Sequence, residues 1–278
     1  MLPLPMSLSD QDYERIRRLV YEHSRIDLGE NKKELVTARL AKRLRATGIP
    51  DYAAYCAHVD SKKGEEELTH LIDAISTNHT FFFREIKHFD YMRETVLPAA
   101  VKGDPRRVFR LWSAASSSGE EPYSIAIQLD DYFSRQPGWN WKVEATDIST
   151  KILAKAREGI YPAERLREVP PEWMRSYFQK GVNEWEGHFR VKAEVRQRVN
   201  YTHLNLLQPS YPFQEPFHAI WCRNVMIYFD RPTQEQLVNQ LAAKLAPGGW
   251  LFIGHSESLT GIRHPLKAVK PAIYQKPV

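Results

Sequence analysis

The sequence predicts an α/β protein in two domains: a small all-helical domain over residues 1–76 and a doubly wound α/β domain over 77–278. The first is predicted by apolar residues that repeat with the 3.6-residue period of a helix. The second is predicted by strands that alternate with helices, the pattern of a parallel sheet. A chain of 278 residues, 42% hydrophobic and 26% charged, has ordinary globular composition and is long enough for both domains.

Successive helices of the first domain carry recognisable start and stop signals. The run SLSDQDYERIRRLVYEHSRI, from Ser7, opens with Ser and Asp, which cap helix N-termini, before a helical apolar pattern. The run TGIPDYAAYCAHV (47–59) holds a Gly-x-Pro break and then a short helix, and SKKGEEELTHLIDAIS (61–76) a turn and a further helix. We therefore expect a helical module that ends near residue 76.

Four strands are expected in the second domain, after a helix around residues 85–102. The segment 106–133 reads as a buried strand, a loop of small residues and a helix with proline in its first turn. Segment 141–149 is a second strand followed by a helix, 217–229 is a third, and 250–259 is a fourth after another helix. Ligands of such sheets bind at the carboxyl ends of the strands, where SSSGEE, TD and RN fall.

One segment interrupts the alternation. Residues 187–207 alternate apolar and polar side chains over two short runs, which predicts a small antiparallel β-subdomain, at about 180–204, inserted into the α/β domain. Its exposed edge can accept an extended peptide by strand addition. A hairpin that only covers the core fits the same pattern, and both interpretations stay open.

Charge and cysteine usage limit the classes of partner and site. No apolar run approaches a membrane span, the two cysteines lack a CxxC spacing, and the histidines form no metal-binding pattern, so we expect a cytoplasmic protein with no membrane insertion and no metal. The formal net charge is +5. A helical segment at 37–48 is either a solvated face or a docking surface for an acidic partner. Its cations are Arg39, Lys42, Arg43 and Arg45.

The loop after the first strand favours a cofactor without phosphate. Residues 114–119 read Ala-Ala-Ser-Ser-Ser-Gly, without the GxGxxG spacing of a phosphate cradle, and two acids that would repel pyrophosphate follow at once. Asp147 ends the second strand, where an acid accepts hydrogen bonds from ribose hydroxyls. Adenosine without phosphate, beside acids suited to a cation, points to S-adenosylmethionine.

Four ordered motifs give the chain a family resemblance. They are NHTFFFRE (78–85), whose phenylalanines could equally be core behind a capping Asn or Thr, SAASSSGEEPYSIAI, ATDIS and FHAIWCRNVMIYFD. In this order and behind a helical domain, they resemble the chemotaxis receptor methyltransferases, the CheR family. The resemblance covers essentially the whole chain and implies a Rossmann-like S-adenosylmethionine-dependent methyltransferase domain.

The resemblance also implies a set of site residues. The phenylalanines of NHTFFFRE would form the wall beside the reacting methyl, Asp147 would bind the ribose, and Asn205 and Leu206 would lie along the adenine. Tyr228 would lie near the transferred methyl, and we expect Arg84 and Tyr228 to be the catalytic residues. The implied cofactor-binding residues are Asn78, Thr80, Arg84, Glu121, Asp147, Asn205, Leu206, Cys222, Arg223 and Asn224.

The family's reaction is methylation of glutamate carboxylates on chemoreceptor signalling helices, with S-adenosylhomocysteine as the second product. A glutamate carboxyl is already ionised at pH 7, so no general base is needed, and alignment of the carboxylate oxygen with the methyl and sulfur is the main task. We hypothesise that Arg84 steers a carboxylate and that Tyr228 helps to fix the approach of the methyl. The resemblance places the basic helical segment in the domain that docks receptor. A receptor's C-terminal aromatic–acidic peptide is a further implied partner, at the β-subdomain.

The sequence leaves two other classes of function open. One is a nucleic-acid methyltransferase that reads its substrate with the basic helical domain, although the signatures for base methylation are missing. The other is a module that senses S-adenosylmethionine without turnover.

Overall fold

The computed structural model describes residues 7–76, 80–103 and 106–278. The chain divides into two compact units. One comprises Met1–Thr77 with the short segment Tyr228–Thr233, and the other Asn78–Ile227 with Gln234–Val278. No helix among the described residues is long and apolar enough to span a membrane.

The first unit is built from helices, as the sequence predicts. The side chain of Ser9 caps the first helix by accepting a hydrogen bond from the Asp12 amide, and that of Asp51 caps the third by accepting one from Ala54. Leu40, Tyr55 and Leu71 are among the fully buried residues of its own core. The helices are α1 (Asp10–Ser24), α2 (Lys33–Thr47), α3 (Tyr52–Val59), the single turn η1 (Lys62–Gly64) and α4 (Glu65–Ile75).

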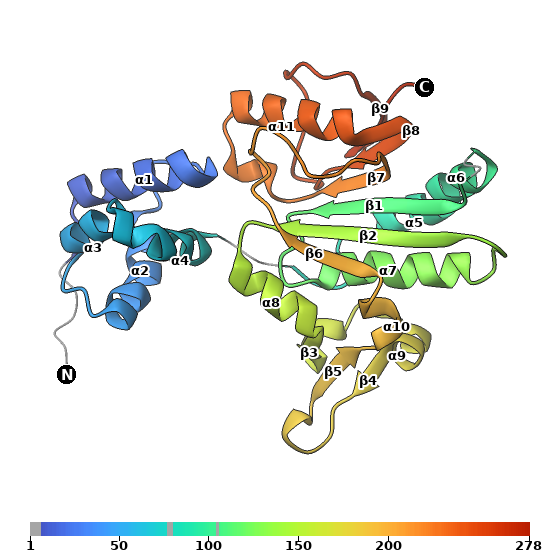
Figure 1. Ribbon diagram of the computed structural model, residues 1–278, viewed down its shortest axis with the longest axis horizontal. Coiled ribbons are helices and arrows are strands. Elements are labelled where there is room, and N and C mark those ends of the chain that lie inside the picture. The colour runs from blue at the N-terminus through green and yellow to red at the C-terminus, as the bar shows by residue number, and fades with distance from the viewer. Residues whose placement is uncertain (1–6, 77–79, 104–105) are drawn as a thin grey trace. The chain divides into compact units, whose positions relative to one another are not determined.

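The second unit is a seven-stranded sheet in the order β6-β2-β1-β7-β8-β10-β9 (Figure 1). Its first five strands run parallel, whereas β10 is antiparallel to β8 and to β9. This confirms the doubly wound class. The strands are β1 (Val108–Ala114), β2 (Asn140–Asp147), β6 (Val199–His203), β7 (Phe217–Cys222), β8 (Leu245–Phe252), β9 (Lys267–Lys270) and β10 (Ile273–Gln275).

Helices connect these strands and bury the sheet. Trp112, Trp141 and Trp221 lie on three neighbouring strands and are almost fully buried. The predicted helix near 85–102 is interrupted by a π-helical turn at Met92–Val96. The helices are α5 (Ile86–Tyr91), α6 (Leu97–Gly103), α7 (Glu120–Phe133), α8 (Thr150–Glu158), α9 (Pro171–Tyr177), α10 (Ala193–Arg196) and α11 (Arg231–Lys244).

Two predicted strands end earlier than expected. The strand in 217–229 ends at Cys222, and a 3₁₀ turn, η5, follows at Met226–Tyr228. The strand predicted at 250–259 is β8, which begins earlier, at Leu245, and ends at Phe252; beyond its end, Glu257 accepts hydrogen bonds from the amides of Met226 and Gly254. Both strands therefore end at the ligand-binding edge of the sheet.

The antiparallel insertion exists, but its predicted bounds of about 180–204 are corrected. Its three strands, β3 (Ile160–Pro162), β5 (His188–Val191) and β4 (Phe178–Lys180), pair antiparallel in that order. The second alternating run is strand β6, which pairs parallel with β2 in the main sheet. Alternation gives the period of a strand but does not identify its partner. We call the segment Ile160–Val191, with its short helix η3 (Ala163–Leu166), the β-subdomain.

Candidate cofactor site at the carboxyl edge of the sheet

Three central strands end side by side. The parallel register places Ala114 opposite both Thr146 of β2 and Cys222 of β7. The loop after β1, the acid at the end of β2 and the Arg–Asn pair after β7 therefore meet at one edge of the sheet, the position at which doubly wound folds bind ligands.

The loop after β1 is held close to β2. The amide of Ser116 donates to the Thr146 carbonyl over 2.8 Å, and that of Ser117 to Asp147 Oδ2 over 2.8 Å. Gly119 has φ +98°, and a Cβ there would lie 2.7 Å from the Tyr161 hydroxyl. Only glycine fits this turn.

Asp147 is positioned by backbone donors. The side chain is buried, and in addition to the Ser117 amide its Oδ1 accepts from the Ser149 amide over 2.9 Å. The Asp147 carbonyl accepts from Leu204 over 3.0 Å, which brings the chain after β6 alongside. Asn205 and Leu206 follow at once, so the structure brings these three predicted residues together. Leu206 is buried, and Asn205 Oδ1 accepts from the Leu207 amide.

A buried arginine joins three segments at this edge. Arg223 donates to Glu121 Oε2 over 3.0 Å and to Glu85 Oε2 over 2.9 Å, and also to the Arg84 carbonyl over 2.6 Å. Glu121 Oε1 accepts from the Ser113 hydroxyl over 2.8 Å. The side chains of Glu121 and Arg223, both predicted to bind cofactor, thus bind each other and tie α7 to the NHTFFFRE segment.

Burial and this arginine oppose each other in setting the carboxyl pKa values. Burial raises the pKa of Glu121 above its ordinary value, against the pull of Arg223. For Glu85, burial also acts to raise the pKa, but Arg223 together with the His255 amide and the Asn224 side chain outweighs it, and the net pKa is lowered. Cys222 is fully buried at the end of β7, and burial raises the pKa of its thiol, which disfavours the reactive thiolate.

Glu257 was not predicted from the sequence and organises the turn after β7. Its carboxylate accepts from the amides of Asn224 over 2.9 Å, Met226 over 2.8 Å and Gly254 over 2.6 Å. Asn224 has φ +57°, so it needs this support. In the sequence, the position of Glu257 in GHSES, directly after the last parallel strand, was the feature that could have indicated this role.

The NHTFFFRE segment is part core and part edge. Phe82 and Phe83 are buried, as the core interpretation requires, and Phe83 and Glu85 have φ values of +55° and +60°. Thr80 is buried, and its carbonyl accepts from Arg165 over 2.8 Å. The Arg84 guanidinium lies 5.9 Å from the centre of the half-buried Phe81 ring. Asn78 lies outside the described residues.

Tyr228 groups with the helical unit rather than with Arg84. Its carbonyl accepts from the Asp27 amide over 2.8 Å, and the Lys32 ammonium lies 5.9 Å from its ring centre. The predicted part of Tyr228 in orienting the methyl stays a prediction.

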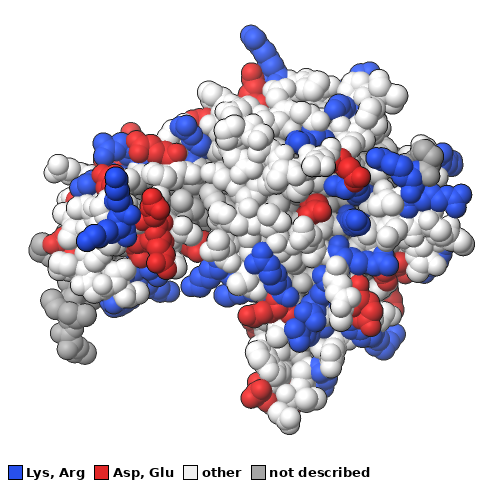
Figure 2. Space-filling model, in the orientation of Figure 1, with Lys and Arg blue, Asp and Glu red and all other residues white. Residues whose placement is uncertain are grey.

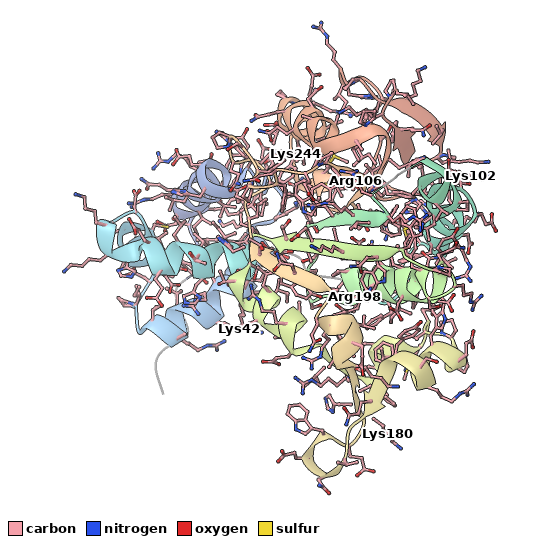
Figure 3. The ribbon with its side chains drawn as sticks, turned by 45° about the vertical axis from the view of Figure 1, so that its right-hand side comes forward. Lys42, Lys102, Arg106, Lys180, Arg198 and Lys244 are labelled. Atoms are coloured by element: carbon pink, nitrogen blue, oxygen red, sulfur yellow. The ribbon has the colours of Figure 1, made fainter. Side chains whose placement is uncertain are left out.

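The four cations predicted to dock substrate divide into two pairs. Arg39 donates to the carbonyls of Ala74, Ile75 and Ser76, at the end of α4. Arg43 binds Glu67 through two hydrogen bonds of 2.9 and 2.6 Å. Both arginines therefore hold helices together. Lys42, labelled in Figure 3, and Arg45 are exposed on the same helix, so the docking prediction now rests on these two.

Among the described residues, one group has ligand atoms close enough to share a metal ion. It consists of Glu85, His88 and His255, whose ligand atoms lie within 4.8 Å of one another. Burial first, and then the nearby Arg223, lower the pKa of His88 to about 3. The same guanidinium occupies the Glu85 carboxylate, and its positive charge opposes a cation. We interpret the group as part of the arginine network.

Comparison with known proteins identifies the family. Residues 11–76 match the model of the all-alpha domain of CheR methyltransferases, and residues 78–274 match that of their SAM binding domain. The chain belongs to the CheR methyltransferase family. It is 42% identical to the chemotaxis protein methyltransferase of Salmonella typhimurium, over 92% of this chain and 87% of that one. It is 38% identical to the chemotaxis protein methyltransferase of Borreliella burgdorferi, over 98% of this chain and 96% of that one.

The edge described above lies within the stretch that matches the SAM binding domain of this family. Strands β1, β2 and β7, the loop 114–119 and Asp147 all fall within the matched residues 78–274. The Vibrio parahaemolyticus protein, also a chemotaxis protein methyltransferase, is 35% identical over 98% of both chains. Family and geometry thus identify a S-adenosylmethionine-dependent methyltransferase.

Proposed function

We propose that this protein methylates the glutamate side chains of chemoreceptors, using S-adenosylmethionine, for adaptation in chemotaxis. The products are glutamate methyl ester and S-adenosylhomocysteine. The observation that carries the proposal is the meeting of the small-residue loop, Asp147 and the Arg223–Asn224 turn at one edge of a domain that matches the CheR cofactor domain.

The chemistry asks for orientation rather than for a strong base. A glutamate carboxyl with a pKa of about 4.3 is almost fully ionised at pH 7. Carboxylate and sulfonium lose their opposite charges as the methyl moves, so tight binding of either ion in the ground state would slow the step. Alignment can contribute on the order of 7–11 kcal/mol. In this proposal Arg84 steers a carboxylate and Tyr228 limits the approach of the methyl.

The proposed cofactor contacts follow the geometry of the edge. Asp147, oriented by two backbone amides, would accept hydrogen bonds from the ribose hydroxyls. The backbone at Asn205 and Leu206 would lie along the adenine, and Thr80 would border the methionyl end. Glu121 and Arg223 would act through the ion pair between them. Cys222 would supply only buried surface beneath the cofactor.

Two surfaces would bind receptor. Lys42 and Arg45 would attract acidic faces of the signalling helices, which would raise the association rate. Strand β4 has a free edge in the small sheet, and Lys180, labelled in Figure 3, lies on it. With exposed Arg190 and Trp185 nearby in sequence, this edge would suit a C-terminal aromatic–acidic peptide that adds as a strand. Because both cysteines are free, we place the activity in the cytoplasm.

The alternatives receive no support. Lys and Arg on the face shown in Figure 2 are interspersed with Asp and Glu rather than gathered into one basic surface, unlike a nucleic-acid interface. The similar proteins quoted above are all named as methyltransferases of chemotaxis, which disfavours a sensor without turnover.

Transfer of radiolabelled methyl from S-adenosylmethionine to a chemoreceptor cytoplasmic fragment, followed by mild alkali, tests the proposal. Label that joins the fragment and leaves as methanol is the expected result, because carboxyl methyl esters hydrolyse in mild alkali. Label that resists alkali, or joins RNA or DNA instead, would contradict the proposal.

A further inference from the structure

The β-subdomain contacts both segments that are assigned to the cofactor. On strand β3, the Tyr161 hydroxyl donates to the carbonyl of Ser118, in the loop after β1, over 2.7 Å. On the adjoining turn η3, Arg165 donates to the carbonyl of Thr80, in the NHTFFFRE segment, over 2.8 Å. Each contact crosses more than forty residues of chain, so it fixes tertiary structure rather than a local turn.

Polar contacts join these two into one chain. The Ser118 hydroxyl donates to Glu120 Oε2 over 2.6 Å, and Glu120 Oε1 lies 3.7 Å from Arg165 Nη1. Tyr161, Ser118, Glu120, Arg165 and Thr80 therefore form a continuous series, which we call the polar chain. It begins and ends on the two cofactor segments and passes twice through the β-subdomain.

Aromatic packing lies beneath the polar chain. Phe82 meets the Tyr161 ring edge-on at 5.0 Å and the Phe178 ring, from β4, at 5.5 Å. Phe83 packs at 5.1 Å against Trp173 of α9. Edge-on aromatic pairs favour one mutual orientation. The rings fix how far the NHTFFFRE segment lies from the subdomain, and the polar chain then fixes its direction.

Charge in the polar chain is partly enclosed. The Glu120 side chain is 2% exposed and the Arg165 side chain 43% exposed. Burial raises the pKa of Glu120, whereas the Ser118 hydroxyl and Arg165 favour its charged form. Arg165 is thus a half-exposed side chain placed to act on a buried carboxylate and a buried carbonyl, and its removal leaves the hydrophobic core intact.

We propose that Tyr161 and Arg165 are positioning residues for the cofactor site, holding the loop 114–119 and Thr80 in the geometry that binds S-adenosylmethionine. Neither needs to touch the cofactor. The proposal rests on the proposed function only in taking S-adenosylmethionine as the ligand. It gives the β-subdomain a part in cofactor affinity in addition to any part in binding a peptide.

The test compares Tyr161→Phe and Arg165→Gln with wild type. Tyr161→Phe keeps the ring and removes the hydroxyl that donates to the Ser118 carbonyl, and glutamine is too short to reach both the Thr80 carbonyl and Glu120. Arg165→Lys keeps the charge and should recover part of the effect. Arg167→Gln, an exposed position two residues along, is the matched control.

We expect calorimetry with S-adenosylhomocysteine to show a Kd raised roughly 3- to 10-fold in each variant, the range of one hydrogen bond. The KM for S-adenosylmethionine should rise likewise, while kcat at saturating cofactor and the KM for receptor fragment stay at wild-type values. The double variant should lose less than the product of the single losses, because both residues act through Ser118 and Glu120.

Several outcomes would overturn the proposal. Wild-type Kd values in both variants would do so, and so would a lowered unfolding midpoint with an unchanged Kd, which would mark a purely structural contact. Wild-type protein that binds S-adenosylhomocysteine but methylates no receptor would refute the proposed function and leave the positioning test valid. Wild-type protein that binds neither form of the cofactor would refute both.

Discussion

At the scale of the residue, the site depends on Arg223. Its side chain is 1% exposed and donates hydrogen bonds to two carboxylates and one backbone carbonyl, so this residue holds three segments of the site together, and its predicted contact with the cofactor stays a prediction. Such a role does not follow from sequence spacing, because Glu85, Glu121 and Arg223 come from three separate segments. Strained backbone at Phe83, Glu85 and Asn224 surrounds this contact.

Replacing Arg223 by alanine should cost about 3–5 kcal/mol of the free energy of unfolding, because two buried carboxylates lose their partner. The pKa of Glu121, already raised by burial, should rise further. A raised carboxyl pKa contributes stability that is present at low pH and lost as pH rises through the folded-state value. Urea unfolding should therefore show a smaller deficit at pH 5.5 than at pH 7.5. Arg167→Ala is the control, and a deficit below 1 kcal/mol at pH 7.5 would contradict this role.

Replacing Arg84 should lower activity and leave stability unchanged, in contrast to the replacement of Arg223. It is half-buried against Phe81, and its proposed task is to orient a carboxylate. Arg84→Ala should lower kcat/KM at least about 10-fold, the loss of one charged hydrogen bond, with the unfolding midpoint unchanged. The neighbouring exposed Lys87→Ala is the control. Turnover retained in Arg84→Ala would remove Arg84 from the reaction.

His88 should make the protein sensitive to acid. Burial lowers its pKa from the ordinary 6.5 to about 3, so between these pH values His88 is protonated in the unfolded chain but neutral in the folded protein. Stability from this group is complete above about pH 6.5 and is lost progressively as pH falls toward 3. Unfolding free energies measured from pH 7 to 4.5 should fall less steeply in His88→Phe than in wild type. His203→Phe, at an exposed position, should keep the wild-type slope, and equal slopes in all three would refute the assignment.

At the scale of the element, helix α2 combines two tasks that the sequence pattern does not separate. The periodicity of 37–48 predicts the helix and its buried face. It cannot tell that Arg39 bonds the end of α4 or that Arg43 meets the buried Glu67, since both partners lie far along the chain. Lys42 and Arg45 are the two cations of this segment that stay exposed.

Lys42→Ala and Arg45→Ala together should raise the KM for receptor fragment and flatten its dependence on salt, with no change in stability. Exposed charges steer association and are screened by salt. Arg43→Ala should instead destabilise the helical unit by about 3–5 kcal/mol, because the nearly buried Glu67 loses its ion pair. Methylation rates equally sensitive to salt in wild type and the double variant would exclude this docking surface.

At the scale of the whole molecule, the order of strands, helices and loops along the chain was predictable, whereas the contacts between residues far apart in the sequence were not. The alternating strands, the loop after β1 and Asp147 all follow from local pattern, because parallel strands bring their carboxyl ends together. The sheet that contains Val199–His203 and the contribution of Glu257 depend on pairing across the fold. So do Tyr161 and Arg165, which look like ordinary members of a small hairpin region until their partners are seen.

The most direct test of the central claim is tandem mass spectrometry of a chemoreceptor cytoplasmic fragment after incubation with the protein and S-adenosylmethionine. We predict one methyl group on individual glutamate side chains, absent without cofactor and removed by mild alkali. A methyl group on lysine, arginine or a backbone amine, or an unmodified receptor beside a protein that binds the cofactor, would contradict it.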